Sequence, residues 1–413
     1  MNHWLAVLFS LFIAGIFILE QYYLLRRLKG YLKEKKAKRW MISSVTVVFI
    51  LFNLPLLFIA ALRPRLSTLP YWFVVGGVMP FYIWHATLLG IFLMLMIGKL
   101  IKLPIVTTVW AKRKFLKETV APVENSIEQF PYTKQRREFL QKGIIALSGV
   151  AFVGSVYGTF RRNDYDIVNV TFPIPNLPNE FNNFTMTLVA DIHSSVFMSK
   201  ERMTEYAEVI NAQHSDMILM PGDFVTQQLD EIYPFAEAFS SLKAPSGVYG
   251  VLGNHDFYTG EVTAVAKEVN ACGIKLLRND CITLQKNGST LHLLGLDDIS
   301  TNQQAENALN YAMRSIKDDS PKILMCHRPY FFDVAEKKGI ALTLSGHTHG
   351  GQIVFFRAGT NIIAPARMAS PYVAGSYLKN NSILYVNRGL GTVGIPVRIN
   401  CPPEITKIRL VKA

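Results

Sequence analysis

The sequence predicts a chain of two parts, in which N-terminal membrane-spanning helices precede an α/β domain. Half of the 413 residues are hydrophobic, and the long apolar stretches all lie in the first 160 residues. From Asp164 onward, short apolar runs alternate with amphipathic segments, which is typical of strands and helices in turn. The length leaves room for two or three domains.

Four apolar stretches predict the membrane part. A helix needs about 20 residues to cross a hydrocarbon core. The stretches cover residues 4–25, 40–62, 71–98 and the shorter 143–160. The first lacks a basic segment before it and a clear cleavage site, which favours an anchor over a signal peptide. The predicted domains are a membrane domain of three helices (1–103), a basic linker (104–142), a fourth span or signal anchor (143–160) and an α/β domain (163–413).

Charge predicts the orientation of these segments. The net charge is +13, and much of it lies beside the apolar stretches. Residues 26–39 carry eight Lys or Arg against the single acid Glu34, so this loop should be cytoplasmic. By the same rule, the chain returns to the cytoplasm after the third stretch, and the fourth leads it out again. The α/β domain is therefore predicted to be extracytoplasmic. It has no basic run interleaved with aromatics, and nucleic acid is not an expected partner.

A pair of arginines precedes the fourth apolar stretch. The run Arg136-Arg137-Glu138-Phe139-Leu140 resembles a twin-arginine export signal. This resemblance implies the twin-arginine export machinery as a partner. The alternative is an ordinary basic flank of a short anchor.

Five predicted strands each end in residues that can bind a metal. These residues are Asp191 and His193; Asp223; Asn254 and His255; His327; and His347 and His349. On extended backbone, both members of an Asp-x-His or His-x-His pair would face the same way, because strand side chains alternate. Glycines beside the ligands allow close approach of the backbone. One such pair has a trivial explanation, but five strand ends together predict a metal site.

The motif order is similar to that of the calcineurin-like metallophosphoesterase superfamily, over roughly residues 180–410. The matching motifs are Asp191-x-His193, Gly222-Asp223, Gly253-Asn254-His255-Asp256, His327 and Gly346-His347-Thr348-His349. The segment from Tyr385 to Gly391 resembles bacterial membrane-anchored or exported members. The resemblance implies a two-sheet sandwich flanked by helices, with a dinuclear metal site at the strand ends. Together with the four apolar stretches, it predicts a multi-pass protein of the bacterial cytoplasmic membrane.

The same resemblance implies a role for each ligand. Asp191, His193 and His349 would hold one divalent ion. Asn254, His327 and His347 would hold the other, and Asp223 would bridge both. Mixed imidazole and oxygen ligands suit Mn, Fe or Zn. A water bridging two such ions has a lowered pKa and can attack a phosphoester as hydroxide.

Three further residues are candidates for the reaction. His255 is left over from the metal ligands and is the candidate general acid, with Asp256 as the candidate to orient its ring. Arg328 follows His327 at a position where relatives often carry Asn, Gln or Glu. Its guanidinium suits either a substrate phosphate or a surface salt bridge.

The predicted function is that of a membrane-anchored, metal-dependent phosphoester hydrolase. Its substrate could be a lipid phosphate, an envelope-polymer precursor or a soluble phosphoester. One alternative is a cytoplasm-facing enzyme that cleaves the pyrophosphate of a UDP-linked acylated sugar, and another is a non-catalytic membrane sensor or scaffold.

The four cysteines have no CxxC spacing and so do not indicate a zinc knuckle. Cys272 and Cys281 could form a disulfide or remain free thiols.

Overall fold

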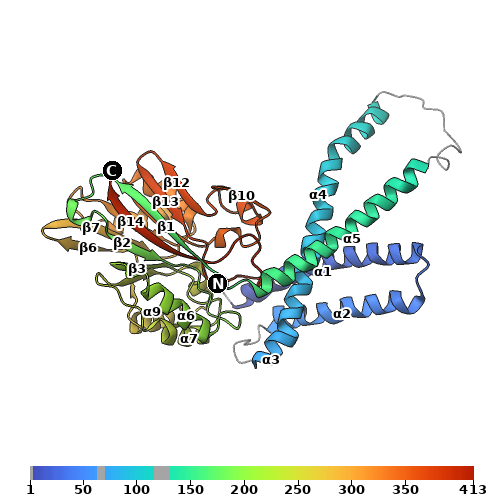
Figure 1. Ribbon diagram of the computed structural model, residues 1–413, viewed down its shortest axis with the longest axis horizontal. Helices are drawn as coiled ribbons and strands as arrows, with labels where there is room; N and C mark the ends of the chain where they lie inside the picture. Colours follow the sequence, from blue (N-terminus) through green and yellow to red (C-terminus); the bar gives the residue numbers. More distant parts are fainter. Residues whose placement is uncertain (1–2, 63–69, 116–130) are drawn as a thin grey trace. The chain divides into compact units, whose positions relative to one another are not determined.

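The computed structural model describes residues 3–62, 70–115 and 131–413. These residues form two compact units (Figure 1). Of the described residues, 3–62, 75–115 and 131–157 form a helical unit. The other unit comprises residues 70–74 and 158–413 and contains every strand of the described residues.

The helical unit contains the first two predicted apolar stretches and most of the third and fourth. Its long helices are α1 (His3–Glu34), α2 (Arg39–Leu62), α4 (Met79–Phe115) and α5 (Pro131–Phe160), and a short α3 (Tyr71–Phe73) and the π-helix η2 (Val74–Val78) precede α4. Within the described residues, three segments are long and apolar enough to cross a membrane: Arg39–Ala61, Val74–Pro104 and Lys142–Phe160. The first predicted span lies in α1, which is not among these three.

Helix continues into both ends of the predicted basic linker. The helix α4 ends at Phe115 and α5 begins at Pro131, so the Arg136-Arg137 pair lies in a helix. The remainder of the linker, residues 116–130, lies outside the described residues. The predicted domain boundaries stay predictions.

A polar contact joins three helices of this unit. The Gln21 side-chain oxygen accepts hydrogen bonds from Asn53 Nδ2 at 2.8 Å and from Trp84 Nε1 at 2.9 Å. Apolar side chains of the same helices, Leu24, Phe49 and Leu88, pack together beside it. Hydrogen bonds between helices stabilise packing where apolar surface alone gives little driving force.

The other unit is a sandwich of two six-stranded sheets. The first sheet has the order β1-β14-β2-β3-β4-β5 and the second β12-β13-β9-β8-β7-β6. The strands of the first are β1 (Asp166–Ile174), β2 (Thr185–Leu188), β3 (Met217–Pro221), β4 (Val248–Val251), β5 (Lys275–Leu276) and β14 (Glu404–Lys412). Those of the second are β6 (Asp280–Lys286), β7 (Ser289–Leu296), β8 (Lys322–Cys326), β9 (Leu342–Ser345), β12 (Gly375–Lys379) and β13 (Ser382–Val386).

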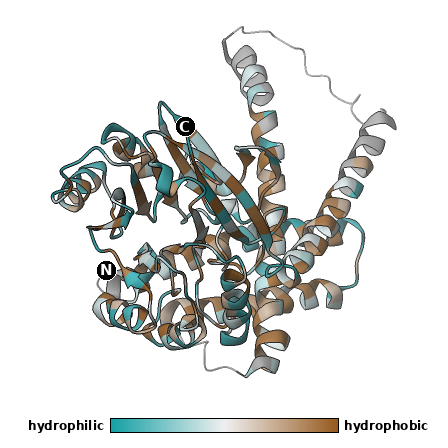
Figure 2. Ribbon diagram, turned by 60° about the vertical axis from the view of Figure 1, so that its left-hand side comes forward, coloured by the Kyte–Doolittle hydropathy of each residue, from teal (hydrophilic) through white to brown (hydrophobic). Residues whose placement is uncertain are grey.

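Side-chain alternation along the strands builds three apolar layers. Leu219 of β3 packs with Leu293 and Ile323 of the other sheet in the core between the sheets. Its neighbours Ile218 and Met220 face the opposite way, against the helices α6 (Lys200–Asn211), α7 (Ile232–Phe239) and α9 (Val262–Ala271). The helices α10 (Asn302–Ala312) and α11 (Phe332–Lys337) cover the outer face of the second sheet. The predicted two-sheet sandwich flanked by helices is confirmed (Figures 1 and 2).

Two edge strands of the sandwich do not coincide with apolar runs of the sequence. β1 and β12 carry alternating polar and exposed side chains, so neither forms an apolar run. The Asn287-Gly288 turn joins β6 to β7, with positive φ at both residues. The four cysteines are all free thiols in this structure.

The loop after β13 is held by one buried arginine. Arg398 is 4% exposed and donates to main-chain carbonyls of several loop residues. The acceptors are the carbonyls of Arg388 at 2.9 Å, Gly389 at 3.1 Å, Gly391 at 2.5 Å, Cys401 at 3.1 Å and His349 at 3.4 Å. Arg398 therefore ties this loop to the one that carries His349.

Replacing this arginine should destabilise the sandwich. Arg398→Met keeps an unbranched side chain but leaves several buried carbonyls without a donor, so we expect a loss of about 3 kcal/mol in the free energy of unfolding. For a unit of this size, the melting temperature should fall by roughly 6–12 °C. Thermal unfolding of the purified chain measures the change. Arg409→Met, on an exposed position of β14, is the control, and an equal melting temperature for the two variants would contradict this role of Arg398.

Candidate metal centre

The strand ends of the two sheets meet at one edge of the sandwich. β2, β3 and β4 are parallel neighbours in the first sheet, and β8 and β9 are parallel neighbours in the second. The carboxyl ends of parallel strands lie at the same edge, where open α/β folds bind ligands. The loops that follow carry all seven predicted metal ligands, and the structure brings them together: Asp191, His193, Asp223, Asn254, His327, His347 and His349.

The backbone at the ligands is left-handed. The predicted extended backbone at the two paired motifs is wrong, because these residues follow β2 and β9 and do not belong to them. The φ angle is 50° at Asp191 and at His193, 57° at Asp223, 72° at His347 and 50° at His349. Such conformations cost of order 1 kcal/mol each at residues with a side chain and persist where the surroundings hold them. Here the Asp191 N–H donates to Gly222 O at 3.0 Å and the His193 N–H to Asp223 O at 3.1 Å.

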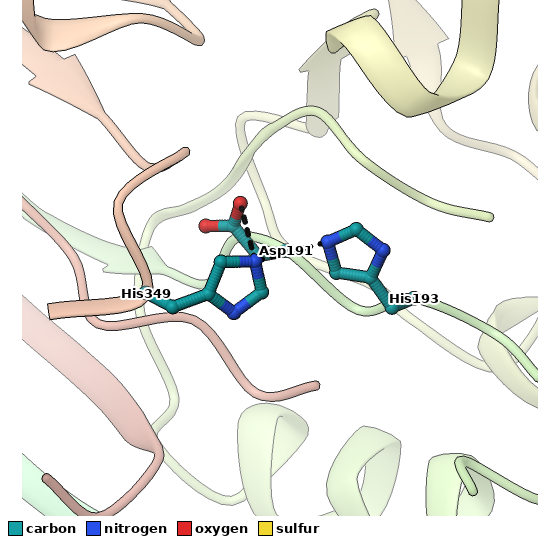
Figure 3. Close-up of side chains that lie close together, drawn as sticks. All are labelled: Asp191, His193 and His349. Carbon is teal, nitrogen blue, oxygen red and sulfur yellow. Dashed lines mark hydrogen bonds and ion pairs between the residues drawn. The ribbon is translucent and has the colours of Figure 1, made fainter. Parts of the chain in front are cut away.

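One group of ligands consists of Asp191, His193 and His349, all buried (Figure 3). The Nε2 atoms of the two histidines lie 3.1 Å apart, and His349 Nε2 lies 3.6 Å from Asp191 Oδ1. His349 Nδ1 donates to the Gly391 carbonyl at 3.3 Å, which leaves the Nε2 lone pair facing the group. Burial lowers the pKa of His193 to about 3 and keeps the ring neutral, as a ligand must be.

The second group surrounds His327. Its Nδ1 donates to the Pro221 carbonyl at 2.7 Å. Its Nε2 lies 3.2 Å from both Asn254 Oδ1 and Asp223 Oδ2, and 3.3 Å from His347 Nδ1. Oxygen acceptors and nitrogen lone pairs thus converge on one point. Although burial opposes it, the pKa of His327 rises to about 10 because Asp223 favours the charged ring. The donor set of imidazole, carboxylate and amide oxygen suits a divalent transition metal.

Asp223 lies between the two groups. Its Oδ2 is 3.2 Å from His327 Nε2 and 3.5 Å from His193 Nε2, while its Oδ1 accepts the His255 N–H at 2.8 Å. Burial works against ionisation, but the neighbouring His327 and His255 hold the pKa of Asp223 well below its usual range. A single anionic carboxylate is therefore within reach of both sets of histidines.

Two glycines make room for the carboxylates. A Cβ atom on Gly253 would lie 2.2 Å from Asp223 Oδ1, and one on Gly346 would lie 2.3 Å from Asp191 Oδ2. No larger residue fits at either position unless a ligand moves. The predicted close approach of the backbone is confirmed at these two positions.

His255 lies at the rim of this centre. It is half-buried, its ring centroid is 4.6 Å from that of His193, and its Nδ1 is 2.5 Å from the Thr226 carbonyl. It also forms a group with His193 and Asp223 that could contact a metal ion. The Thr226 carbonyl, and not a carboxylate, therefore orients the ring.

Asp256 contacts the loop that carries Asp223. It is fully buried in the short helix α8 (Asn254–Tyr258) and accepts main-chain N–H bonds from Asp223 at 3.0 Å, Phe224 at 2.9 Å, Val225 at 3.2 Å and Gly253 at 2.8 Å. The predicted contact with the His255 ring is wrong, because the third position of a helix points back to the N–H groups before it. Burial and the nearby Asp223 raise the pKa of Asp256 to about 8, and the N–H bonds oppose that rise.

Arg328 is engaged in an ion pair. Its Nε and Nη2 donate to the Asp298 carboxylate at 2.5 and 2.8 Å, and Nη1 donates to the Tyr330 hydroxyl at 2.6 Å. The Tyr330 ring lies 6.0 Å from that of His347. Of the two roles predicted for Arg328, the structure contains the salt bridge, which lies beside the metal centre. A contact of Arg328 with substrate phosphate stays a prediction.

The resemblance to known phosphoesterases is confirmed by comparison. The profile of the calcineurin-like phosphoesterase family matches residues 184–351. The metallophosphoesterase YkuE of Bacillus subtilis is 32% identical over 289 residues, which cover 67% of this chain and 97% of that protein. A transmembrane protein with a metallophosphoesterase domain from Danio rerio is 28% identical, and the alignment covers 64% of this chain and 62% of that protein. The chain belongs to the calcineurin-like phosphoesterase family, and this membership supports a metal-dependent phosphoester hydrolase.

Solved structures resemble the chain more distantly. The crystal structure of TT1561 from Thermus thermophilus is 14% identical, with a TM-score of 0.35, and the match covers 51% of this chain and 91% of that one. A dimetal phosphatase from Danio rerio matches with a TM-score of 0.31 at 10% identity, over 51% of this chain and 88% of that one.

Removing the Asp256 carboxylate should loosen the loop that carries Asp223. Asp256→Ala leaves four buried N–H groups without an acceptor, so we expect a loss of about 3 kcal/mol in stability and weaker metal retention. Melting temperature and metal content by elemental analysis measure the two effects. Glu261→Ala, an exposed carboxylate three residues after α8, is the control. Unchanged metal content and stability in the Asp256 variant would contradict the positioning role.

Proposed function

We propose that the chain is a membrane-anchored hydrolase of phosphoester bonds that works with two divalent metal ions. The observation that carries the proposal is the position of Asp223 Oδ2, within 3.5 Å of histidines from both ligand groups. A structural site for a single ion would not need two such groups to share one carboxylate. Family membership supports the same reaction class.

The described residues supply a complete donor set for two ions. Asp191, His193 and His349 would hold one, Asn254, His327 and His347 the other, and Asp223 both. Mn, Fe or Zn suits this mixture of imidazole and oxygen donors. When bound, a pair of divalent ions offsets the charge of the phosphoryl group and supplies the nucleophile by activating water.

The remaining polar residues would bind and protonate the substrate. His255 donates from Nδ1 to the Thr226 carbonyl, so its imidazolium form would hold the transferable proton on Nε2. This proton could pass to the leaving oxygen. Asn254 contributes a neutral oxygen and adds no negative charge where a phosphate must enter. Arg328 would reach substrate only if its bond to Asp298 rearranged.

Asp223 and His255 should respond differently to substitution. We expect Asp223→Ala to lose both metal and activity, because the shared ligand is gone. His255→Ala should keep its metal and lose about 100-fold or more in kcat, as removal of a general acid does. Elemental analysis and hydrolysis of an aryl phosphate and an aryl phosphodiester by the Mn-loaded chain measure both quantities. Metal retained in the Asp223 variant would rule out bridging, and metal lost in the His255 variant would make His255 a ligand.

The distribution of charge supports an extracytoplasmic catalytic unit. The eight basic residues in the loop 26–39 would keep that loop in the cytoplasm, and an odd number of further crossings then leads the chain outward. The same reasoning favours a multi-pass protein of the bacterial cytoplasmic membrane. It also makes the Arg136-Arg137 segment a candidate for the twin-arginine export machinery.

A reporter fused after Ala413 tests the orientation. A phosphatase that folds only in the oxidising periplasm should be active in this fusion, and a fluorescent protein that matures only in the cytoplasm should be dark. The opposite pair of results would place the metal centre on the cytoplasmic side. Fusion of the same reporters after Glu34 gives the internal control, because that loop is predicted to be cytoplasmic.

A further inference from the structure

A small apolar lobe lies beside the metal centre. It comprises the hairpin of β10 (Phe356–Ala358) and β11 (Asn361–Ile363), the 3-10 helix η8 (Pro365–Met368) and the residues that flank them, 355–369 (Figure 1). A pocket of about 240 Å³ opens between the lobe and the ligands. His347 and His349 line one side of this pocket, and Ala366 and Ala369 of the lobe line another.

The hairpin has one buried face and one exposed apolar face. Arg357 pairs with Ile362 across the two strands, and Ile362 is buried in a small cluster with Val354 and Val373. Phe356 pairs with Ile363 and, by strand alternation, both side chains point the opposite way. They are 55% and 60% exposed. Large apolar side chains thus lie on both faces of the hairpin, although only one face packs against the rest of the protein.

Two further large apolar side chains of the lobe are exposed. Met368 of η8 is 94% exposed, and Phe355, just before β10, is 54% exposed. The lobe therefore presents several large apolar side chains to its surroundings, while its residues Ala366 and Ala369 line the pocket that leads to the metal ligands. Such groups mark binding sites more often than free surface.

The charge of the lobe indicates what kind of apolar molecule it would take. Residues 352–371 contain two arginines, Arg357 and Arg367, and no Asp or Glu. Arg357 lies on the face of the hairpin opposite to Phe356 and Ile363, and Arg367 directly precedes Met368. A lobe with basic and no acidic residues suits an amphiphile with an anionic head. The helical unit of the same chain contains three segments long enough to cross a membrane, so membrane lipids are available to it.

We infer that the apolar lobe binds the acyl chains of a lipid-linked phosphoester, whose phosphate enters the metal centre through the adjoining pocket. The inference rests on the proposed function for the chemistry and names the substrate class. The acyl chains would lie on Phe356, Ile363 and Met368. Burial of three such side chains against hydrocarbon contributes enough binding free energy for a selectivity of about tenfold or more.

The test compares two substrates of the full-length, Mn-loaded chain in mixed micelles. One is phosphatidic acid with long acyl chains, and the other is p-nitrophenyl phosphate, which has none. In the variant F356S/I363S/M368S, the ratio of kcat/KM for the lipid to that for the aryl phosphate should fall about tenfold or more. Leu378→Ser, 75% exposed on β12, removes an apolar side chain elsewhere and should leave the ratio unchanged.

Binding of a phosphonate analogue of the lipid separates the two proposals, because its C–P bond is not hydrolysed. Weaker binding of the analogue to the triple variant supports lipid binding by the lobe, even if neither substrate is hydrolysed. Absence of hydrolysis would then contradict only the proposed function. Equal binding of the analogue to the variant and the unmodified chain, with an unchanged ratio of kcat/KM, would overturn the inference. If the aryl phosphate is still hydrolysed, the proposed function is unaffected by that result. A change of oligomeric state in the triple variant with no change in lipid binding would also overturn it and make the lobe a contact between two copies of the chain.

Discussion

The contact of the Asp223 carboxylate with two sets of histidines is the constraint on which the catalytic unit depends. Ligands from both sheets reach this carboxylate, so the sheets must hold their relative position to within fractions of an ångström. Each sheet is pinned at this edge by main-chain bonds: Asp191 N–H to Gly222 O links the loops after β2 and β3, and Gly346 N–H to His327 O at 3.1 Å links those after β9 and β8. The apolar core between the sheets supplies the rigidity behind these bonds.

Strain and crowding at the centre are the cost of bringing the ligands together. Five ligands adopt left-handed backbone conformations, and two glycines leave room for carboxylate oxygens where a Cβ would not fit. The Asp256 carboxylate and the Arg398 guanidinium offset part of this cost. Asp256 accepts the N–H groups of the Asp223 loop, and Arg398 donates to the carbonyls of the loops around His349. Neither touches the point at which the ligands converge, so both act through the backbone.

The convergence of the candidate ligands at one edge could be predicted, because each apolar run ends directly in a side chain that can bind a metal. Asp223 and His327 illustrate this. The left-handed backbone at Asp191 and His193 could not be predicted, since Asp and His adopt it more often than most residues but still in a minority of cases. The bonds that hold it come from Gly222 and Asp223. Three of the four N–H groups that Asp256 accepts lie 31 to 33 residues away, and main-chain groups have no signature in a sequence. The strand β1 could not be predicted for another reason. Its exposed polar positions break the apolar run, and the strand with which it pairs, β14, lies at the far end of the chain.

The central claim, that Asp223 joins two metal ions in one centre, is tested most directly by electron paramagnetic resonance of the Mn-loaded chain. Two manganese ions that share a bridging ligand are magnetically coupled and give a spectrum unlike that of isolated ions. We expect about two Mn per chain and a coupled spectrum, and in Asp223→Ala the loss of that coupling. One Mn per chain, or two that give only the spectrum of isolated ions, would contradict a shared carboxylate.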